Sequence, residues 1–149
     1  MTNRRRAGVR DGLEIHEVHP ADYVRSDGRR ASTLALSVDG AQRLVFVSGQ
    51  VAFDRMRQVV GEGDLATQLS QAYRNIEAIV LADGASMANV VSLRTFLVDV
   101  AHVEAYRDRQ TQLHHEIWGD GPYPTNTLVV VSGLADPRLL VEVEAVAVA

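Results

Sequence analysis

Apolar residues recur along this chain with two periods, and the changes between them mark the predicted elements. Runs typical of β-strands, several of them alternating, occupy residues 13–18, 34–38, 44–53, 90–98, 127–131 and 139–148. Steps of three and four, typical of an amphipathic helix, occur over residues 65–80 and again over residues 102–117. The predicted order is therefore two or three strands, a helix, a strand, a helix and two strands.

Turn and cap residues support these boundaries. Asp64 can cap the first helix, and Asp83-Gly84 can end it. Asp39-Gly40 lies between two apolar runs and predicts a hairpin. Two amphipathic helices on one face of a mixed sheet make an α+β two-layer sandwich. We expect one domain over residues 13–149, preceded by a flexible, arginine-rich tail over residues 1–12.

The second face of the predicted sheet has no helix left to cover it. Phe46, Phe96 and Val98 are apolar and fall on this face. Self-association with closed symmetry is the natural way to bury such a surface.

Composition narrows the chemistry. The chain has no cysteine and no lysine, and its formal net charge is −4. Disulfides, thiolate chemistry and lysine Schiff bases are therefore excluded, and broad nucleic-acid binding is disfavoured. No apolar run reaches the ~20 residues of a membrane span, and no apolar segment follows the charged N-terminus, so we expect a cytoplasmic protein.

Three stretches resemble the RidA/YjgF (reactive intermediate deaminase) family. They are Val45-Phe-Val-Ser-Gly-Gln-Val51, the helix carrying Gln68, Gln71 and Asn75 up to Ala82-Asp-Gly84, and Pro124-Thr-Asn-Thr-Leu-Val-Val-Val-Ser-Gly-Leu134 followed by Leu140-Val-Glu-Val-Glu-Ala-Val-Ala147. Each motif alone is weak, whereas their order and spacing are fairly specific. Together they cover about residues 40 to 148.

The resemblance implies a chorismate-mutase-like fold, a homotrimer and a ligand cleft at each subunit interface. Deaminating members hydrolyse enamines or imines of 2-oxo acids to the oxo acid and ammonia. By this likeness Glu142 falls on the glutamate that positions water. Ser48 and Gly49 fall on the pocket strand, Tyr23 on the pocket tyrosine, and backbone groups near Leu128 would hold the ligand. The chemistry implies no cofactor and no metal, because an imine carbon is already electrophilic.

Position 126 departs from the family pattern. Asn126 stands where the deaminases have the arginine that clamps the substrate carboxylate. Asparagine can form hydrogen bonds but carries no charge, so the cleft suits a neutral ligand, or one whose anion meets another arginine. Arg94, Arg107 and Arg55 are the candidates for such a relocated arginine.

Other groups are open to more than one interpretation. Trp118 and Tyr123 either form an aromatic wall over the ligand or pack against a neighbouring subunit. His114 and His115 are adjacent on a predicted helix and point about 100° apart, so they do not readily share a metal ion. Ser48 lies in Ser-Gly-Gln, which is not a nucleophile elbow.

The sequence thus supports a small-metabolite-binding trimer that hydrolyses enamines or imines. The alternative is a ligand-binding or sensor trimer without catalysis, and Asn126 favours it. An endoribonuclease or translation inhibitor is a third and less favoured hypothesis, since single-stranded RNA calls for a basic groove with stacking aromatics.

Overall fold

The computed structural model describes the backbone of residues 2–10, 13–20 and 32–149. Its regular elements are β1 (Thr2–Arg10), β2 (Leu13–Pro20), β3 (Leu36–Asp39), β4 (Leu44–Gln50), α1 (Leu65–Ala82), β5 (Val90–Leu97), α2 (Val103–Trp118), β6 (Thr125–Val130) and β7 (Val141–Val148). Short 3-10 turns at Met87–Asn89 and Val100–His102 precede β5 and α2. Both predicted helices are confirmed within one or two residues at each end.

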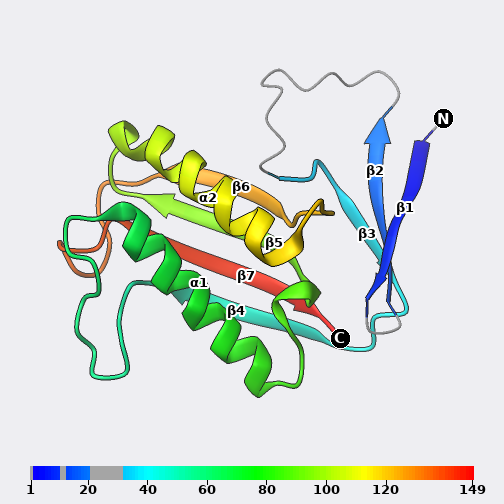
Figure 1. Cartoon of the computed structure of the whole chain (residues 1–149), viewed down its shortest axis with the longest axis horizontal. Helices are drawn as coiled ribbons and strands as arrows, with labels where there is room; N and C mark the ends of the chain where they lie inside the picture. The colour runs from blue at the N-terminus through cyan, green and yellow to red at the C-terminus, as the bar shows by residue number, and fades with distance from the viewer. Residues whose placement is uncertain (1, 11–12, 21–31) are drawn as a thin grey trace.

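The centre of the fold is a four-stranded sheet in the order β4-β7-β5-β6. Strands β5 and β6 are parallel and the other pairs antiparallel, so the sheet is mixed, as predicted. Figure 1 shows α1 and α2 lying side by side over one face of this sheet. Alternation along β7 places Val141, Val143 and Ala145 in the core beneath them, each at most 3% exposed. The α+β two-layer class is therefore confirmed.

Helix α1 begins where the sequence predicts. The Asp64 carboxylate accepts a hydrogen bond from the Thr67 backbone N–H at 3.1 Å, which satisfies one of the free donors of the first turn. The helix ends before Gly84, which adopts a φ of 81°. Burial of a side chain such as Leu69 or Ile76, both fully inaccessible, stabilises the fold by roughly 1.5–3 kcal/mol.

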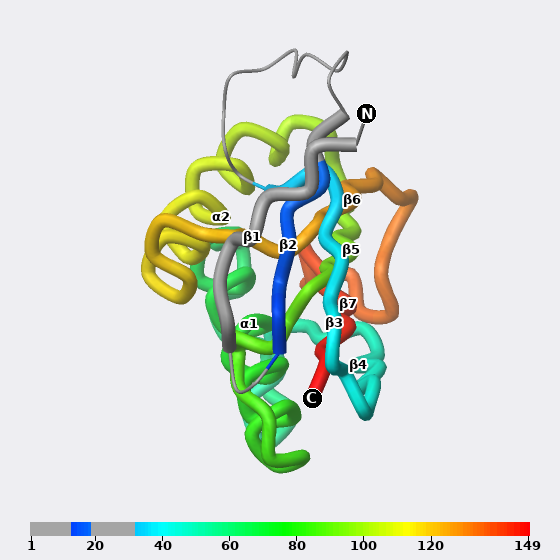
Figure 2. Tube along the Cα trace, turned by 90° about the vertical axis from the view of Figure 1, so that its right-hand side faces the viewer, coloured from blue at the N-terminus to red at the C-terminus, as the bar shows by residue number. Residues whose placement is uncertain are grey.

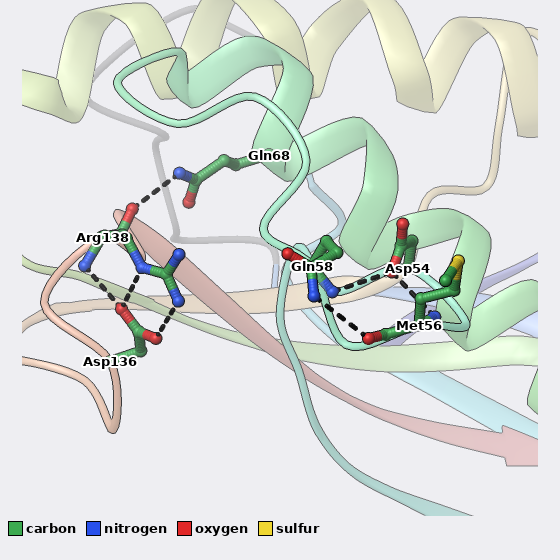
Figure 3. Close-up of polar contacts among 6 residues, drawn as sticks. All are labelled: Asp54, Met56, Gln58, Gln68, Asp136 and Arg138. Atoms are coloured by element: carbon green, nitrogen blue, oxygen red, sulfur yellow. Dashed lines mark hydrogen bonds and ion pairs between the residues drawn. The ribbon is translucent and has the colours of Figure 1, made fainter.

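Two side-chain amides of α1 hold the loops that flank the central strands. Gln68 donates to the backbone oxygens of Arg138 and Gly61, at 2.9 and 3.1 Å, and accepts from the Leu140 N–H at 2.8 Å. Figure 3 shows Gln68 reaching the loop in which Asp136 pairs with Arg138. Asn75 donates to the backbone oxygens of two residues just beyond β4. These contacts fix where β4 ends and β7 begins.

The N-terminal strands form a separate three-stranded sheet in the order β1-β2-β3, which stands beside the end of the central sheet (Figure 1). The predicted hairpin at Asp39-Gly40 is wrong, because β3 pairs with β2 whereas β4 pairs with β7. Gly40 does turn the chain, with a φ of 88°. A local turn signal specifies a change of direction but not the partner of the next strand.

The arginine-rich segment also differs from expectation. Residues 2–10, for which we expect a flexible tail, form β1 and pair antiparallel with β2. The segment shows little apolar alternation, so periodicity gives no sign of the strand. The strand is defined instead by its antiparallel backbone pairing with β2.

Candidate functional site

The carboxylate of Glu142 lies against the backbone of Gly49. Two residues of β4, Ser48 and Gly49, fall in a register shift between Val47 and Gln50, where β4 pairs with β7. A β-carbon at position 49 would overlap the Glu142 carboxylate, so only glycine leaves room for it. Irregularities of this kind re-aim side chains and are frequent beside active sites.

Glu142 projects from the face of the central sheet opposite the helices. We call this the open face; its described residues include Phe46, Ser48, Arg94, Thr127, Glu142 and Glu144. Burial raises the pKa of Glu142 above its ordinary value of 4.5, and the charge of Glu144 adds to the increase. Phe96, on β5, is its cross-strand partner. A half-buried carboxylate with a raised pKa beside an aromatic ring is suited to accepting a proton from water.

The open face carries a cavity of about 450 Å³, whose lining includes Glu144 but not Glu142. Ser48 and Arg94 line it, together with Thr127 and Phe46. Arg94 donates to the Glu144 carboxylate at 2.8 Å, so its charge is paired. The structure thus gathers Ser48, Gly49, Arg94 and Glu142 of the predicted site residues on one surface. Of the other candidate arginines, Arg107 pairs with Glu104 on α2.

Asn126 projects to the helix side of the sheet. Its Nδ2 donates to the Tyr106 hydroxyl at 2.7 Å, and its Oδ1 accepts from the Thr95 hydroxyl at 3.2 Å. The Thr95 hydroxyl has one proton and donates it to Asn126. In the 3.0 Å contact between the two hydroxyls, Tyr106 is therefore the donor and Thr95 the acceptor. The three side chains therefore form a closed ring of hydrogen bonds. Burial raises the pKa of Tyr106 to about 12, so its hydroxyl keeps its proton.

Sequence reasoning missed Thr95 and Tyr106 as partners of Asn126. The available signal was a polar Thr95 among the apolar residues on the buried face of β5.

Leu128, two residues after Asn126, packs partly against the core. Strand β6 is an edge of the central sheet, and the Val131 N–H donates to the Leu97 carbonyl on β5. Backbone N–H groups along a strand point alternately to its two sides, so the Leu128 N–H points away from β5 to the free edge, where it can meet a ligand.

The two aromatic candidates pack within the subunit. Trp118 is 6% exposed and its indole N–H donates to the Met87 carbonyl at 3.0 Å. Tyr123 and Trp118 both contact the ring of His114, at centroid distances of 5.5 and 4.9 Å. Both rings thus pack against the buried His114 within the subunit, and the Tyr123 hydroxyl donates to the Gly119 carbonyl at 2.8 Å. Tyr23 lies outside the described residues.

His114 belongs to the core. It is fully buried, and its Nε2 lies 3.0 Å from the Tyr73 hydroxyl. His115 is exposed at the helix end, where its Nδ1 lies 3.2 Å from the Gly119 carbonyl. The two adjacent histidines therefore lie in different environments, one in the core and one at the surface, as their 100° separation on a helix predicts.

Among the described residues, none of the helices is long and apolar enough to cross a membrane.

Comparison with known proteins places these features in a family. The family model described as Endoribonuclease L-PSP matches residues 33–149. A Rid family protein of unknown function from Yersinia pestis has a similar structure, with a TM-score of 0.76 and 28% identity over 91% of this chain and 98% of its own. TdcF of E. coli, solved with bound serine, has a TM-score of 0.64 and 27% identity over 74% of this chain and 82% of its own.

Curated relatives agree with the structural neighbours. Protein DfrA of Myxococcus xanthus is 30% identical over 115 residues, covering 76% of this chain and 82% of that protein. A RutC family protein of Pyrococcus horikoshii is 29% identical over 107 residues, covering 72% of this chain and 80% of that protein. With its two helices on one face of a mixed sheet and a family match over most of its length, the chain belongs to the RidA/YjgF family.

Proposed function

We propose that this protein binds a small metabolite in clefts between its subunits and hydrolyses an enamine or imine there to a carbonyl compound and ammonia. The observation that carries the proposal is the position of Glu142, held against Gly49 on the open face with its pKa raised by burial. Family membership supports a small-molecule-binding or deaminase-like role in general terms. We place this activity in the cytoplasm, as the sequence predicts.

The proposal includes a homotrimer. Phe46 is 76% exposed on the open face, and none of the described helices covers it. Leu44 on β4 and Val129 on β6 extend the exposed apolar surface to both edge strands of the central sheet. A second copy of the chain would bury this surface and close the cavity on the open face.

In the proposed reaction, Glu142 accepts a proton from water as the water oxygen attacks the imine carbon. The imine reacts in its protonated form, so the electron pair of the C=N bond moves to nitrogen as the C–O bond forms, and the product of this step is a neutral carbinolamine. Glu142 then returns its proton to the nitrogen, and the C–N bond breaks as the hydroxyl oxygen forms the carbonyl. The hydroxyl proton passes to Glu142 and from there to ammonia, so the carbonyl compound and ammonium leave. The Leu128 N–H and groups near Ser48 would hold the ligand. No cofactor or metal enters this reaction scheme.

The site favours a ligand without a strong negative charge. Asn126 offers no cation, and its amide is already engaged with Tyr106 and Thr95. Arg94 reaches the cavity with its charge paired to Glu144. We therefore assign the chain to a subgroup that lacks the carboxylate-binding arginine, with Arg94 as the available substitute.

The second candidate is a binding or sensor trimer without catalysis. The closed ring of Asn126, Tyr106 and Thr95 favours it, because a structural asparagine has replaced the residue that deaminases use on substrate. Ribonuclease activity, which the family description names, is less favoured for a chain with a net charge of −4.

The test is ammonia release from enamines generated in situ, 2-aminoacrylate among them, by the wild type, Glu142→Gln and Asn126→Arg. Hydrolysis by the wild type and its loss in Glu142→Gln support the deaminase. An inert wild type with an active Asn126→Arg variant means that an arginine here can leave the helix side and reach the substrate, so the scaffold is competent but the wild type serves another ligand. Inertness in both favours the binding trimer. Salt-dependent binding of single-stranded RNA would favour the ribonuclease instead.

A further inference from the structure

A cluster of metal-ligating side chains lies on the N-terminal sheet, separate from Glu142 and the open face. Glu14 and His16 alternate with the buried Leu13 and Ile15 along β2, so they share the opposite face of that strand. Asp39 on β3 is the direct cross-strand partner of Glu14. Figure 2 shows β2 and β3 running side by side. One imidazole and two carboxylates from two paired strands are thereby brought together.

The distances between the ligating atoms fit a single ion. His16 Nε2 lies 3.3 Å from Asp39 Oδ2 and 3.7 Å from Glu14 Oε2. One ligand atom from each residue lies within 4.8 Å of the other two. In tetrahedral zinc sites with bond lengths of 2.0–2.2 Å, ligand atoms stand roughly 3.4 Å apart. The cluster is thus close to the spacing that coordination requires, before any ion is bound.

The imidazole has a reason to take a ligand. The side chain of His16 is only 13% exposed, and its Nε2 is buried without a hydrogen-bond partner of suitable geometry. The hydroxyl of Ser37, the cross-strand partner of His16, is likewise buried without a hydrogen-bond partner. Buried polar atoms are nearly always satisfied, and those that are not call for an ion or a water. Nε2 is also the atom that faces both carboxylates.

We infer that Glu14, His16 and Asp39 form a binding site for one divalent transition-metal ion of the Zn²⁺ type. An imidazole nitrogen with two carboxylate oxygens suits Zn²⁺ and its neighbours better than Ca²⁺, which prefers oxygen ligands alone. Each carboxylate has two oxygens, so coordination needs only one of them. Three protein ligands leave a fourth position open to water, with the Ser37 hydroxyl nearby to bond that water. This site does not depend on the proposed deaminase activity.

The main competing account is electrostatic. A protonated His16 could pair with both carboxylates and simply hold β2 to β3. This account predicts no ion binding at the cluster, so a metal titration distinguishes the two.

The experiment is a titration of the untagged full chain, stripped with chelator, with Co²⁺ as a spectroscopic substitute for Zn²⁺. We expect one Co²⁺ per chain, visible absorption bands typical of four-coordinate Co²⁺, and displacement of the bands by Zn²⁺. His16→Ala should abolish them. Asp39→Asn, which preserves shape, should weaken binding at least tenfold. His115→Ala, at an exposed histidine elsewhere, is the matched control and should bind as the wild type does.

Circular dichroism of each variant shows whether the fold is retained. Should His16→Ala misfold, the decision rests on Asp39→Asn alone. A wild type that binds no stoichiometric ion overturns the inference. Undiminished binding in Asp39→Asn, or in a folded His16→Ala, overturns it equally.

Discussion

Asn126 donates a hydrogen bond to the hydroxyl of Tyr106 at 2.7 Å, and Thr95 closes the ring with both of them. The amide at position 126 is therefore held by α2 and β5 on the helix side of the sheet, while Glu142 projects from the other side. The amide at position 126 therefore contributes to the packing of α2 against β5 and β6 and does not share a surface with Glu142.

Removing the Tyr106 hydroxyl should destabilise the fold. Tyr106→Phe leaves Asn126 without its acceptor and Thr95 without its donor, and each unsatisfied buried group costs about 1–3 kcal/mol. Urea denaturation measures the change. Tyr123→Phe, which removes an exposed hydrogen bond to Gly119, is the control and should cost less than about 1 kcal/mol. Equal costs for the two variants would argue against a buried, closed ring.

A methyl group at position 49 should impair function more than folding. Gly49→Ala places a β-carbon where the Glu142 carboxylate lies, so the side chain must move. A displacement of ~1 Å can reduce a catalysed rate about 100-fold. Gly133→Ala is the matched control, because a β-carbon there meets nothing within 4 Å. Rates of ammonia release compare the two, and similar rates would contradict the placement of Glu142.

The pH dependence of stability should reveal Glu142. Its pKa in the folded chain is raised above 4.5 by burial, so the folded state binds this proton more tightly than the unfolded chain. Stability from this group is therefore full below pH 4.5 and is lost as the pH rises through the folded pKa. Glu142→Gln removes that loss, so near pH 7 the variant should be at least as stable as the wild type. Urea unfolding between about pH 4 and pH 8 measures both proteins, and a variant less stable than the wild type at neutral pH would contradict the expected sign.

A charge on the open face should break the subunit association. Phe46→Glu puts a carboxylate into the surface that the second copy would bury, and an unpaired buried charge is strongly unfavourable. Sedimentation velocity should show a trimer for the wild type and smaller species for the variant. Met56→Glu, at an equally exposed apolar residue outside the open face, should remain trimeric. A wild type that sediments as a monomer would remove the basis for interfacial clefts.

Periodicity predicts the helices and the central strands because their burial follows local rules. Alternation along β7 puts Val141 and Val143 inward and leaves Glu142 on the open face, as expected from sequence. Strand partners are a different matter. Asp39-Gly40 marks a turn, but only the competition among all strands decides that β4 joins β7 and β3 joins β2.

The candidate site was predictable in part for the same reason. Ser48, Gly49 and Glu142 carry the family pattern, and they meet where β4 pairs with β7. The ring around Asn126 was not predictable, because Tyr106 and Thr95 come from other elements and their contact depends on packing. The cluster of Glu14, His16 and Asp39 likewise needs the cross-strand register, which the sequence does not state.

The most direct test of the central claim is the rate of ammonia release from enamines generated in situ, neutral ones as well as 2-aminoacrylate, measured for the wild type and for folded Glu142→Gln. We predict release by the wild type well above the uncatalysed rate and a loss of at least 100-fold in the variant, in line with the usual contribution of general acid–base catalysis. Equal rates for the two proteins, or a wild type no faster than buffer, would contradict the assignment of Glu142 as the group that activates water.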